Sequence, residues 1–269
     1  MPENHTGSTK ASSDQPETAG DDRRFTPPDT ARWPARWQTP TVADLARLEA
    51  GYRRGLLPVH VRLLHELVPP LAVGSAEAAH VAERLSVAAR READAAQGHM
   101  VGLAAPQVGI PARALLFDPR VDPAGGALPA DDLRCVVNPE VEPIGDDLIR
   151  EIEGCLSTGP IKGWVQRATR VRLRGHTPHG EPIDEVHTGL AAIVIQHEVD
   201  HLDGILFPQR ISEDLDLLWV CTEHVQRFTE YARAHRRGET PEWKTRTPRD
   251  QWDAIRAGLA VLGSLSGAV

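Results

Sequence analysis

The chain has 269 residues, of which 41% are apolar and 25% are charged, and this suits one folded domain with long tails. Its net charge of -8 at pH 7 argues against specific nucleic-acid recognition, because phosphate binding needs clustered Lys and Arg. No apolar run reaches the roughly 18 residues of a membrane span, and three scattered cysteines make no disulfide framework, so we predict a cytoplasmic protein without a membrane partner.

Composition divides the chain into three parts. Residues 1–40 are rich in Ser, Thr, Pro and charge and lack the apolar centre of a secretory signal, so we predict a disordered N-terminal tail. Residues 41–238 carry the periodic apolar patterns of a folded domain. Residues 239–269 are punctuated by proline and form a predicted C-terminal extension, to which we assign no role.

The domain is predicted to begin with helices, and strands follow them. One helix starts after Thr41, and a second runs from about Glu77 to Gln97, with Gly98 as its stop signal. Short apolar runs separated by Pro and Gly predict strands at 112–117, 133–139 and 169–175. The segment GHTPHGEPI, which begins at Gly175, predicts a hairpin turn.

Two further helices are predicted in the second half of the domain. The third helix runs from about Thr188, a suitable N-cap, to Gly204, a suitable stop. The fourth is predicted from about Ser212, because residues recur there at helical spacing, namely Leu215, Leu218, Trp219, Thr222 and Val225.

The third predicted helix carries the motif QHEVDH. His197 and His201 lie one turn apart, so their rings project from one face and can share a metal ion. Glu198 lies beside the first histidine and can act as a general base. The alternative is a helix that merely carries two histidines. It is disfavoured because buried imidazoles without a common partner would leave polar nitrogens unsatisfied, and the stripe is apolar, with Leu190, Ile193 and Val194.

A third metal ligand is predicted upstream, in the motif EGCLS. Cys155 follows Gly154, which permits a tight backbone, and a thiolate is a strong ligand for Fe²⁺ or Zn²⁺. Downstream, residues 205–214 contain no histidine, and the acidic alternatives, Glu213 and Glu223, fall on a separate predicted helix. We interpret the other two cysteines, Cys135 and Cys221, as small core residues.

The segment VGLAAPQVG, at residues 101–109, is built from small residues. Such residues let backbone amides approach a substrate closely, and Gln107 offers both a donor and an acceptor. Taken alone, a segment of this kind is usually only a turn.

Together, GLAAPQ, EGCLS and QHEVDHLDG resemble, in this order, the three signature motifs of the peptide deformylase family, over about residues 55–212. The resemblance implies an α+β fold with mixed, mostly antiparallel sheets around a central helix that carries HEVDH. It implies that the chain removes the N-formyl group from N-formylmethionyl peptides and nascent proteins and releases formate. A transient contact with the ribosome is expected for that role, with the basic segment Arg233–Arg237 as a candidate surface.

The resemblance also implies roles for individual residues. Cys155, His197 and His201 would hold one ion per chain, usually Fe²⁺ in this family, with Zn²⁺ or Ni²⁺ able to substitute. Glu198 would take a proton from water and pass it to the leaving amine. The side-chain amide of Gln107 and the backbone N–H of Leu156 would stabilise the oxyanion.

Further roles concern the peptide substrate. Backbone groups around Val101, Gly102 and Gly154 would hold the peptide extended, as an added strand. The methionine side chain would lie against residues on the histidine face of the helix, namely Leu190, Ile193 and Val194. Arg167 would pair with Glu153 and steady the cysteine loop.

Two residues depart from the motifs of the family. Met100 stands where glycine is usual, and Thr158 stands where an apolar residue is commoner. A side chain at position 100 would narrow or reshape the substrate entrance, which leaves open a deformylase-like amidohydrolase that acts on a small N-formyl compound. A zinc endopeptidase is disfavoured by the cysteine ligand, and a non-catalytic binding module is disfavoured by the retention of Glu198.

Overall fold

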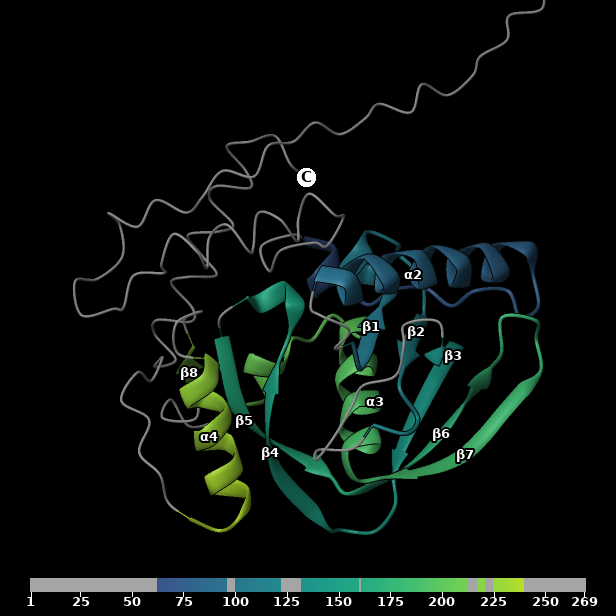
Figure 1. The fold of residues 1–269 in the computed structure, drawn as a ribbon. Helices are drawn as coiled ribbons and strands as arrows, with labels where there is room; N and C mark the ends of the chain where they lie inside the picture. The colour runs from purple at the N-terminus through teal and green to yellow at the C-terminus, as the bar shows by residue number, and fades with distance from the viewer. Residues whose placement is uncertain are drawn as a thin grey trace, which may run out of the picture.

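The computed structural model describes residues 62–95, 100–121, 132–159, 161–211, 217–220 and 225–239. The predicted N-terminal tail, the helix after Thr41 and the extension beyond residue 239 lie outside these residues. Within them, the helix α3 (Gly189–Leu202), which contains HEVDH, lies between a five-stranded sheet and a three-stranded sheet (Figure 1). The predicted α+β class is confirmed.

Every ladder that joins two described strands is antiparallel. The larger sheet has the strand order β1-β2-β3-β6-β7, with β1 (Gly102–Ala104), β2 (Ala114–Phe117), β3 (Arg134–Pro143), β6 (Arg170–His176) and β7 (Pro182–Thr188). The smaller sheet has the order β4-β5-β8, with β4 (Leu148–Gly154), β5 (Ile161–Ala168) and β8 (Leu217–Trp219). The strands β1 and β4 therefore each lie at an edge of their sheet.

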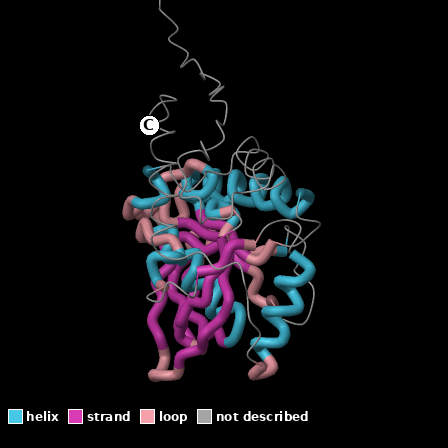
Figure 2. Tube along the Cα trace, turned by 90° about the vertical axis from the view of Figure 1, so that its left-hand side faces the viewer, coloured by secondary structure: helices cyan, strands magenta, loops and turns pink. Residues whose placement is uncertain are grey.

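The other described helices surround the strands, which gather in the middle of the described part (Figure 2). None of the described helices combines the length and the apolar character needed to cross a bilayer. The bounds are α2 (Ala76–Ala95), α4 (Val225–Arg236) and, as 3-10 helices, η2 (Arg62–His65), η3 (Ala105–Val108), η5 (Leu156–Thr158) and η6 (Phe207–Arg210).

Most of the predicted elements are confirmed, and one is wrong in part. The second and third predicted helices correspond to α2 and α3, the predicted strands to β2, β3 and β6, and the hairpin turn joins β6 to β7. The fourth predicted helix is wrong at Leu217–Trp219, which form β8 on the edge of β5, and α4 includes its last predicted residue, Val225. Residues 212–216 and 221–224 of that prediction lie outside the described residues. A contiguous apolar run suits a buried strand as well as a helix face, and Leu218 is fully buried.

The strand β2 is buried on both faces and explains how α3 is held. Ala114 and Leu116 belong to a core cluster that includes Leu85 and Ala89 of α2. The alternate residues of β2 belong to a second cluster, which includes Ile195 of α3. Successive side chains of a strand point to opposite faces, so the sheet is sandwiched between α2 and α3. This accounts for the unbroken apolar sequence of β2, which reads ALLF.

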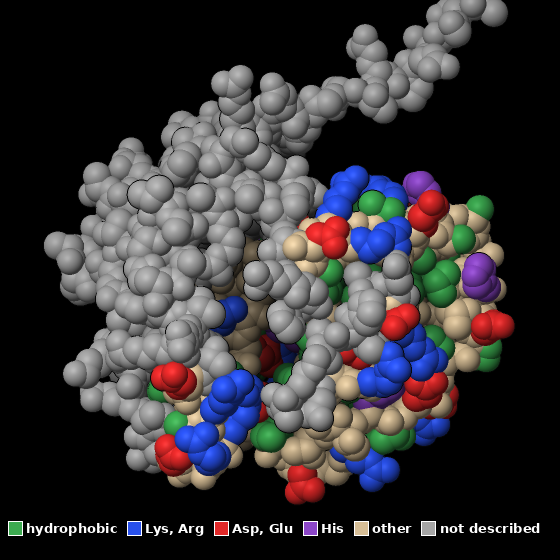
Figure 3. Space-filling model, viewed as in Figure 1, with side chains coloured by type: hydrophobic (Ala, Val, Ile, Leu, Met, Phe, Trp, Pro, Cys, Tyr) green, Lys and Arg blue, Asp and Glu red, His purple; other side chains and the backbone are tan. Residues whose placement is uncertain are grey.

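Ion pairs cover an exposed part of the larger sheet. Arg172 of β6 forms a two-pronged contact with Asp184 of β7, with both N–O distances at 2.6 Å, and both side chains are about half exposed. Arg174 donates to Glu142 of β3 at 3.2 Å. Basic and acidic side chains are likewise intermixed over the described surface in Figure 3. Exposed pairs of this kind contribute about 0–1 kcal/mol each.

The C-terminal end of α3 is fixed by backbone contacts and by charge. Gly204 has a φ of +73°, and a Cβ there would lie 2.6 Å from the carbonyl carbon of His65 and 2.7 Å from the nitrogen of Glu66. Arg113, the residue before β2, donates to the carbonyl of Leu202 and pairs with Asp203 at 2.7 Å, so it places a positive charge at the negative end of the helix.

We expect Gly204→Ala to lower the free energy of unfolding by about 2–5 kcal/mol, because the new Cβ combines left-handed strain with a backbone clash. The matched control is Gly145→Ala, in the turn between β3 and β4, where φ is +77° and no atom lies within 4 Å of the added Cβ. This control carries the strain alone and should cost about 1–2 kcal/mol. Urea unfolding followed by circular dichroism measures both values, and equal losses would contradict the expected clash.

Candidate metal centre

The structure brings the three predicted metal ligands together. Cys155 follows β4, whereas His197 and His201 project from α3, and their ligand atoms all lie within 4.8 Å of one another. The Sγ atom of Cys155 lies 3.3 Å from Nε2 of His201. All three side chains are at most 9% exposed. The centre therefore joins a loop of the smaller sheet to the helix that packs on the larger one.

The turn after Cys155 is closed by Thr158. Its backbone N–H and its hydroxyl both donate to the carbonyl of Cys155, at 3.2 Å and 3.1 Å. The side chain of Thr158 is 4% exposed, so this departure from the family pattern acts on the cysteine turn. Burial opposes ionisation of the Cys155 thiol, but the charges and hydrogen bonds of His201 and His197 outweigh it and hold the pKa of the thiol well below its usual range. The ionised thiolate is the form that binds metals.

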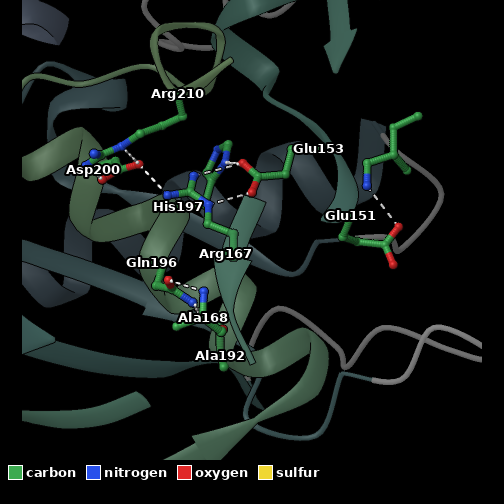
Figure 4. A network of polar contacts seen from close by, with 10 residues as sticks. Glu151, Glu153, Arg167, Ala168, Ala192, Gln196, His197, Asp200 and Arg210 are labelled. Atoms are coloured by element: carbon green, nitrogen blue, oxygen red, sulfur yellow. Dashed lines mark hydrogen bonds and ion pairs between the residues drawn. The ribbon is translucent and has the colours of Figure 1, made fainter. Parts of the chain in front are cut away.

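His197 is oriented by a carboxylate. Its Nδ1 lies 2.8 Å from Oε2 of Glu153, and Arg167 donates to both oxygens of Glu153, at 2.7 Å and 3.0 Å (Figure 4). The predicted pair of Arg167 and Glu153 is confirmed. Burial opposes ionisation of Glu153, but the hydrogen bonds from His197 and Arg167 outweigh it and lower its pKa to about 2. An ionised carboxylate only accepts, so Nδ1 of His197 donates and Nε2 is left to a metal ion.

Glu198 is buried beside the ligands. It is 5% exposed, burial raises its pKa to about 7, and its Oε2 has no hydrogen-bond partner among the described residues. A Cβ on Gly102 would lie 2.4 Å from Oε1 of Glu198 and 2.9 Å from Val194. Glycine is therefore required at position 102 because the carboxylate packs directly against the backbone of β1.

Gln107 presents a donor to the centre. Its Oε1 accepts from the backbone N–H of Ala104 at 2.8 Å, which fixes the orientation of the amide. Its Nε2 then lies 3.3 Å from Sγ of Cys155 and 3.4 Å from the hydroxyl of Ser157. Leu156 is the first residue of η5 and is 37% exposed; N–H groups at the start of a helical turn have no partner within that turn.

The predicted substrate-binding residues fall into two groups. Gly102 begins the edge strand β1 and Val101 precedes it, whereas Gly154 ends the edge strand β4. Of the three apolar residues of α3, Val194 lies against Gly102 and Ile193 is 4% exposed. Leu190 packs against the core cluster shared by α3 and the larger sheet. Their contribution to a methionine pocket stays a prediction.

Met100 is buried in the core. It is 3% exposed and packs in the core cluster that includes Leu85 of α2 and Leu103 of β1. Met100 therefore packs beneath α2, and its effect on the shape of the substrate entrance stays a prediction. Strand alternation explains this outcome, because a flexible apolar side chain beside a buried strand is most stable on the core side.

Sequence reasoning missed two residues of this region. Asp200, inside HEVDH, is 6% exposed and accepts from Arg167 at 2.6 Å and from Arg210 at 2.6 Å. Phe207 stacks its ring on that of His197, with centroids 6.1 Å apart and an interplanar angle of 25°. An acidic residue within a buried helix is itself a signal of an ion pair, because a buried carboxylate is almost always paired with a cation.

The donor set fits a metal ion. One thiolate and two imidazoles suit Fe²⁺ or Zn²⁺, and three protein ligands leave one position open, as in catalytic sites. The unpartnered Oε2 of Glu198 offers an acceptor close to these three ligands. Cys135, by contrast, is half-buried on β3, where burial raises the pKa of its thiol to about 12, and Cys221 lies outside the described residues.

Known proteins are similar to this chain in sequence. Residues 59–215 match the polypeptide deformylase family. Peptide deformylase of Rhodopirellula baltica is 38% identical over 161 residues, which are 59% of this chain and 76% of that protein. Peptide deformylase 2 of Ralstonia nicotianae is 41% identical over 45% of this chain and 67% of that protein. For peptide deformylase 1 of Streptomyces coelicolor the identity is 45%, over 48% of this chain and 60% of that protein, so the chain spans about three fifths of that relative.

Solved structures share the fold. Two ligand-bound crystal structures of the class I type b peptide deformylase from Acinetobacter baumannii are 30% and 32% identical to this chain, each with a TM-score of 0.50. They cover 58% and 59% of this chain and 97% and 98% of their own. The family match extends over more than half of the sequence and includes all three motifs that supply the centre. The chain therefore belongs to the peptide deformylase family.

Proposed function

We propose that this chain removes the N-formyl group from N-formylmethionyl peptides and nascent proteins and releases formate. The observation that carries the proposal is the buried Glu198, whose unpartnered oxygen lies beside a donor set of one thiolate and two imidazoles. A purely structural metal site has no use for such a carboxylate. Membership of the peptide deformylase family supports the same reaction.

The catalytic roles follow from the contacts of each side chain. Cys155, His197 and His201 would hold a divalent ion, which when bound would supply Lewis acidity to the formyl carbonyl and to the attacking water. Glu198 takes the proton of the attacking water at its carboxylate and passes it to the leaving amine; a pKa raised towards 7 suits both transfers. Nε2 of Gln107 and the N–H of Leu156 donate to the developing oxyanion, and each is worth about 3 kcal/mol.

The peptide is proposed to bind in an extended conformation between the edges of the two sheets. Val101 and Gly102 lie at the edge of one sheet and Gly154 lies at the edge of the other, and an edge strand offers unpaired backbone groups to a peptide. The methionine side chain would contact the apolar residues of α3 that precede the ligands, namely Leu190, Ile193 and Val194.

We propose Fe²⁺ as the native ion, with Zn²⁺ or Ni²⁺ able to substitute. The test is the rate of formate release from formyl-Met-Ala-Ser by anaerobically purified protein loaded with each ion in turn. Fast turnover with Fe²⁺ supports both the reaction and the ion. A metal-loaded protein that does not act on this peptide but hydrolyses a small formamide would favour the alternative substrate class. Cleavage of casein would instead indicate an endopeptidase.

We expect Glu198→Ala to lower kcat for formyl-Met-Ala-Ser by about 10²–10⁴-fold, because proton transfer loses its base. The three ligands are unchanged, so the metal content measured by mass spectrometry should equal that of the parent. The control Glu142→Ala removes an exposed glutamate, which is 63% accessible on β3, and should leave kcat unchanged. Parental turnover by Glu198→Ala would contradict the assigned role.

We expect Gln107→Glu to lower kcat by about 10²–10³-fold, because the variant keeps the acceptor for Ala104 N–H and loses the donor to the oxyanion. The control is Gln166→Glu, at an exposed position of β5. Steady-state kinetics with metal content checked in parallel separate the two effects. A kcat equal to that of the control would exclude Gln107 from oxyanion stabilisation.

We also propose a cytoplasmic location and a transient contact with the ribosome, where formylated chains emerge. Within the predicted basic segment, Arg236 pairs with Glu151 at 2.8 Å, and the ring of His235 packs against that of Trp164 with centroids 3.9 Å apart. Arg233 is exposed, and the ion pair of Arg237 with Glu239, at 2.7 Å, has both side chains exposed. These two arginines are therefore the better candidates for contact.

Reversal of these charges in Arg233→Glu/Arg237→Glu should reduce co-sedimentation with ribosomes and leave the turnover of formyl-Met-Ala-Ser unchanged. The control Arg172→Glu/Arg174→Glu makes the same change of charge on the larger sheet. Co-sedimentation that is unaffected by the first pair, or reduced equally by both, would contradict this surface.

A further inference from the structure

A chain of polar contacts extends from His197 to the surface. Glu153 binds Nδ1 of His197 at 2.8 Å and is held by two nitrogens of Arg167. The third nitrogen of Arg167 donates to Oδ2 of Asp200 at 2.6 Å. Arg210 then donates to both oxygens of Asp200, at 2.6 Å and 3.1 Å. Figure 4 shows Arg167 between the two carboxylates and Arg210 at the far end.

The charges within this network of contacts balance, and each nitrogen of Arg167 donates to a carboxylate. Two carboxylates, of Glu153 and Asp200, face two guanidinium groups. Three of the four side chains are buried, with exposures of 4% for Glu153, 5% for Arg167 and 8% for Asp200. Arg210 is 45% exposed. Each of the three nitrogens of Arg167 already donates to a carboxylate oxygen, so a contact with Asp200 through two nitrogens would require Arg167 to withdraw one of them from Glu153.

The same short helix supports His197 from a second direction. Arg210 is the last residue of η6, and Phe207, its first residue, stacks on the His197 ring. Gln209 of η6 accepts from the backbone N–H of Leu206 at 2.7 Å. The segment that follows α3 therefore contacts His197 directly through the Phe207 ring and indirectly through the charge of Arg210.

We propose that Arg210 is a positioning residue for the metal ligand His197, and that it acts by satisfying Asp200 so that Arg167 stays on Glu153. Without Arg210, the buried Oδ1 of Asp200 loses its donor, and two buried carboxylates compete for one guanidinium. A buried carboxylate without a partner is costly, so Arg167 turns towards Asp200. Glu153 then no longer fixes the ring of His197. The inference rests on the proposed metal centre.

The test measures how firmly the ion is held, which does not depend on turnover. Zn²⁺-loaded variants are mixed with a coloured chelator, and the rate of metal transfer is followed; Co²⁺-loaded variants report ligand geometry by their absorption. Arg210→Met should release Zn²⁺ at least about tenfold faster than the parent, the size of effect typical of groups that orient ligands. Arg210→Lys should lie in between, because an ammonium supplies charge without the fork.

The matched control is Arg172→Met. Arg172 also donates to an aspartate with two nitrogens and is 44% exposed. Its partner Asp184, however, is 49% exposed and lies on β7, which supplies no ligand. This control should keep the parental rate of metal release and the parental Co²⁺ spectrum. Equal behaviour of Arg210→Met and Arg172→Met would overturn the proposal and leave Arg210 as an ordinary surface ion pair.

A double variant tests the competition itself. In Asp200→Asn/Arg210→Met the second carboxylate is absent, so Arg167 stays on Glu153 and metal release should return close to the parental rate. Faster release by the double variant than by Arg210→Met alone would overturn the proposal. If Arg210→Met does not fold, recovery of folding and of metal retention in the double variant supports the proposal, and failure to recover contradicts it. A parent that binds no ion would instead refute the proposed function.

Discussion

The structure depends on the burial of a polar helix face. The helix α3 lies between two sheets, and its buried residues include His197, Glu198, Asp200 and His201. Burial of such groups costs several kcal/mol each unless they are paired. The surrounding elements meet part of this requirement: β4 supplies Glu153, β5 supplies Arg167, and η6 supplies Arg210. Among the described residues, this face leaves Nδ1 of His201 and Oε2 of Glu198 without a hydrogen-bond partner, and the proposed reaction uses the oxygen.

The same constraint explains why glycine and small residues surround the centre. Glu198 is packed so closely against β1 that position 102 has no room for a side chain. Gln107 follows directly on the same segment, in η3, and is tied back to Ala104. The proposed base and the proposed oxyanion donor are therefore both aligned by one short edge strand, and that strand is held by β2, which is buried on both faces.

Local patterns in the sequence predicted the local parts of this site well. His197 and His201 are one turn apart on a helix, and helical spacing alone places them together. Cys155 was a candidate ligand from the chemistry of its thiolate, and the resemblance to known motifs then supported it, because no local rule relates residues so far apart in the chain. The strand β8 was predicted as helix, since an apolar run fits both and only the edge of β5 decides between them. The burial of Met100 was not predicted for a similar reason: which side of this segment is core depends on where α2 packs.

The position of the centre between the two sheets has a consequence for folding. Cys155 belongs to the smaller sheet and the two histidines belong to the helix packed on the larger one, so an ion bound there acts as a cross-link between the two halves of the domain. Ligands that bind only the folded state stabilise it by mass action. The supply of metal would then affect how long the chain stays folded as well as its turnover. A shortage of the ion would lower the amount of folded protein.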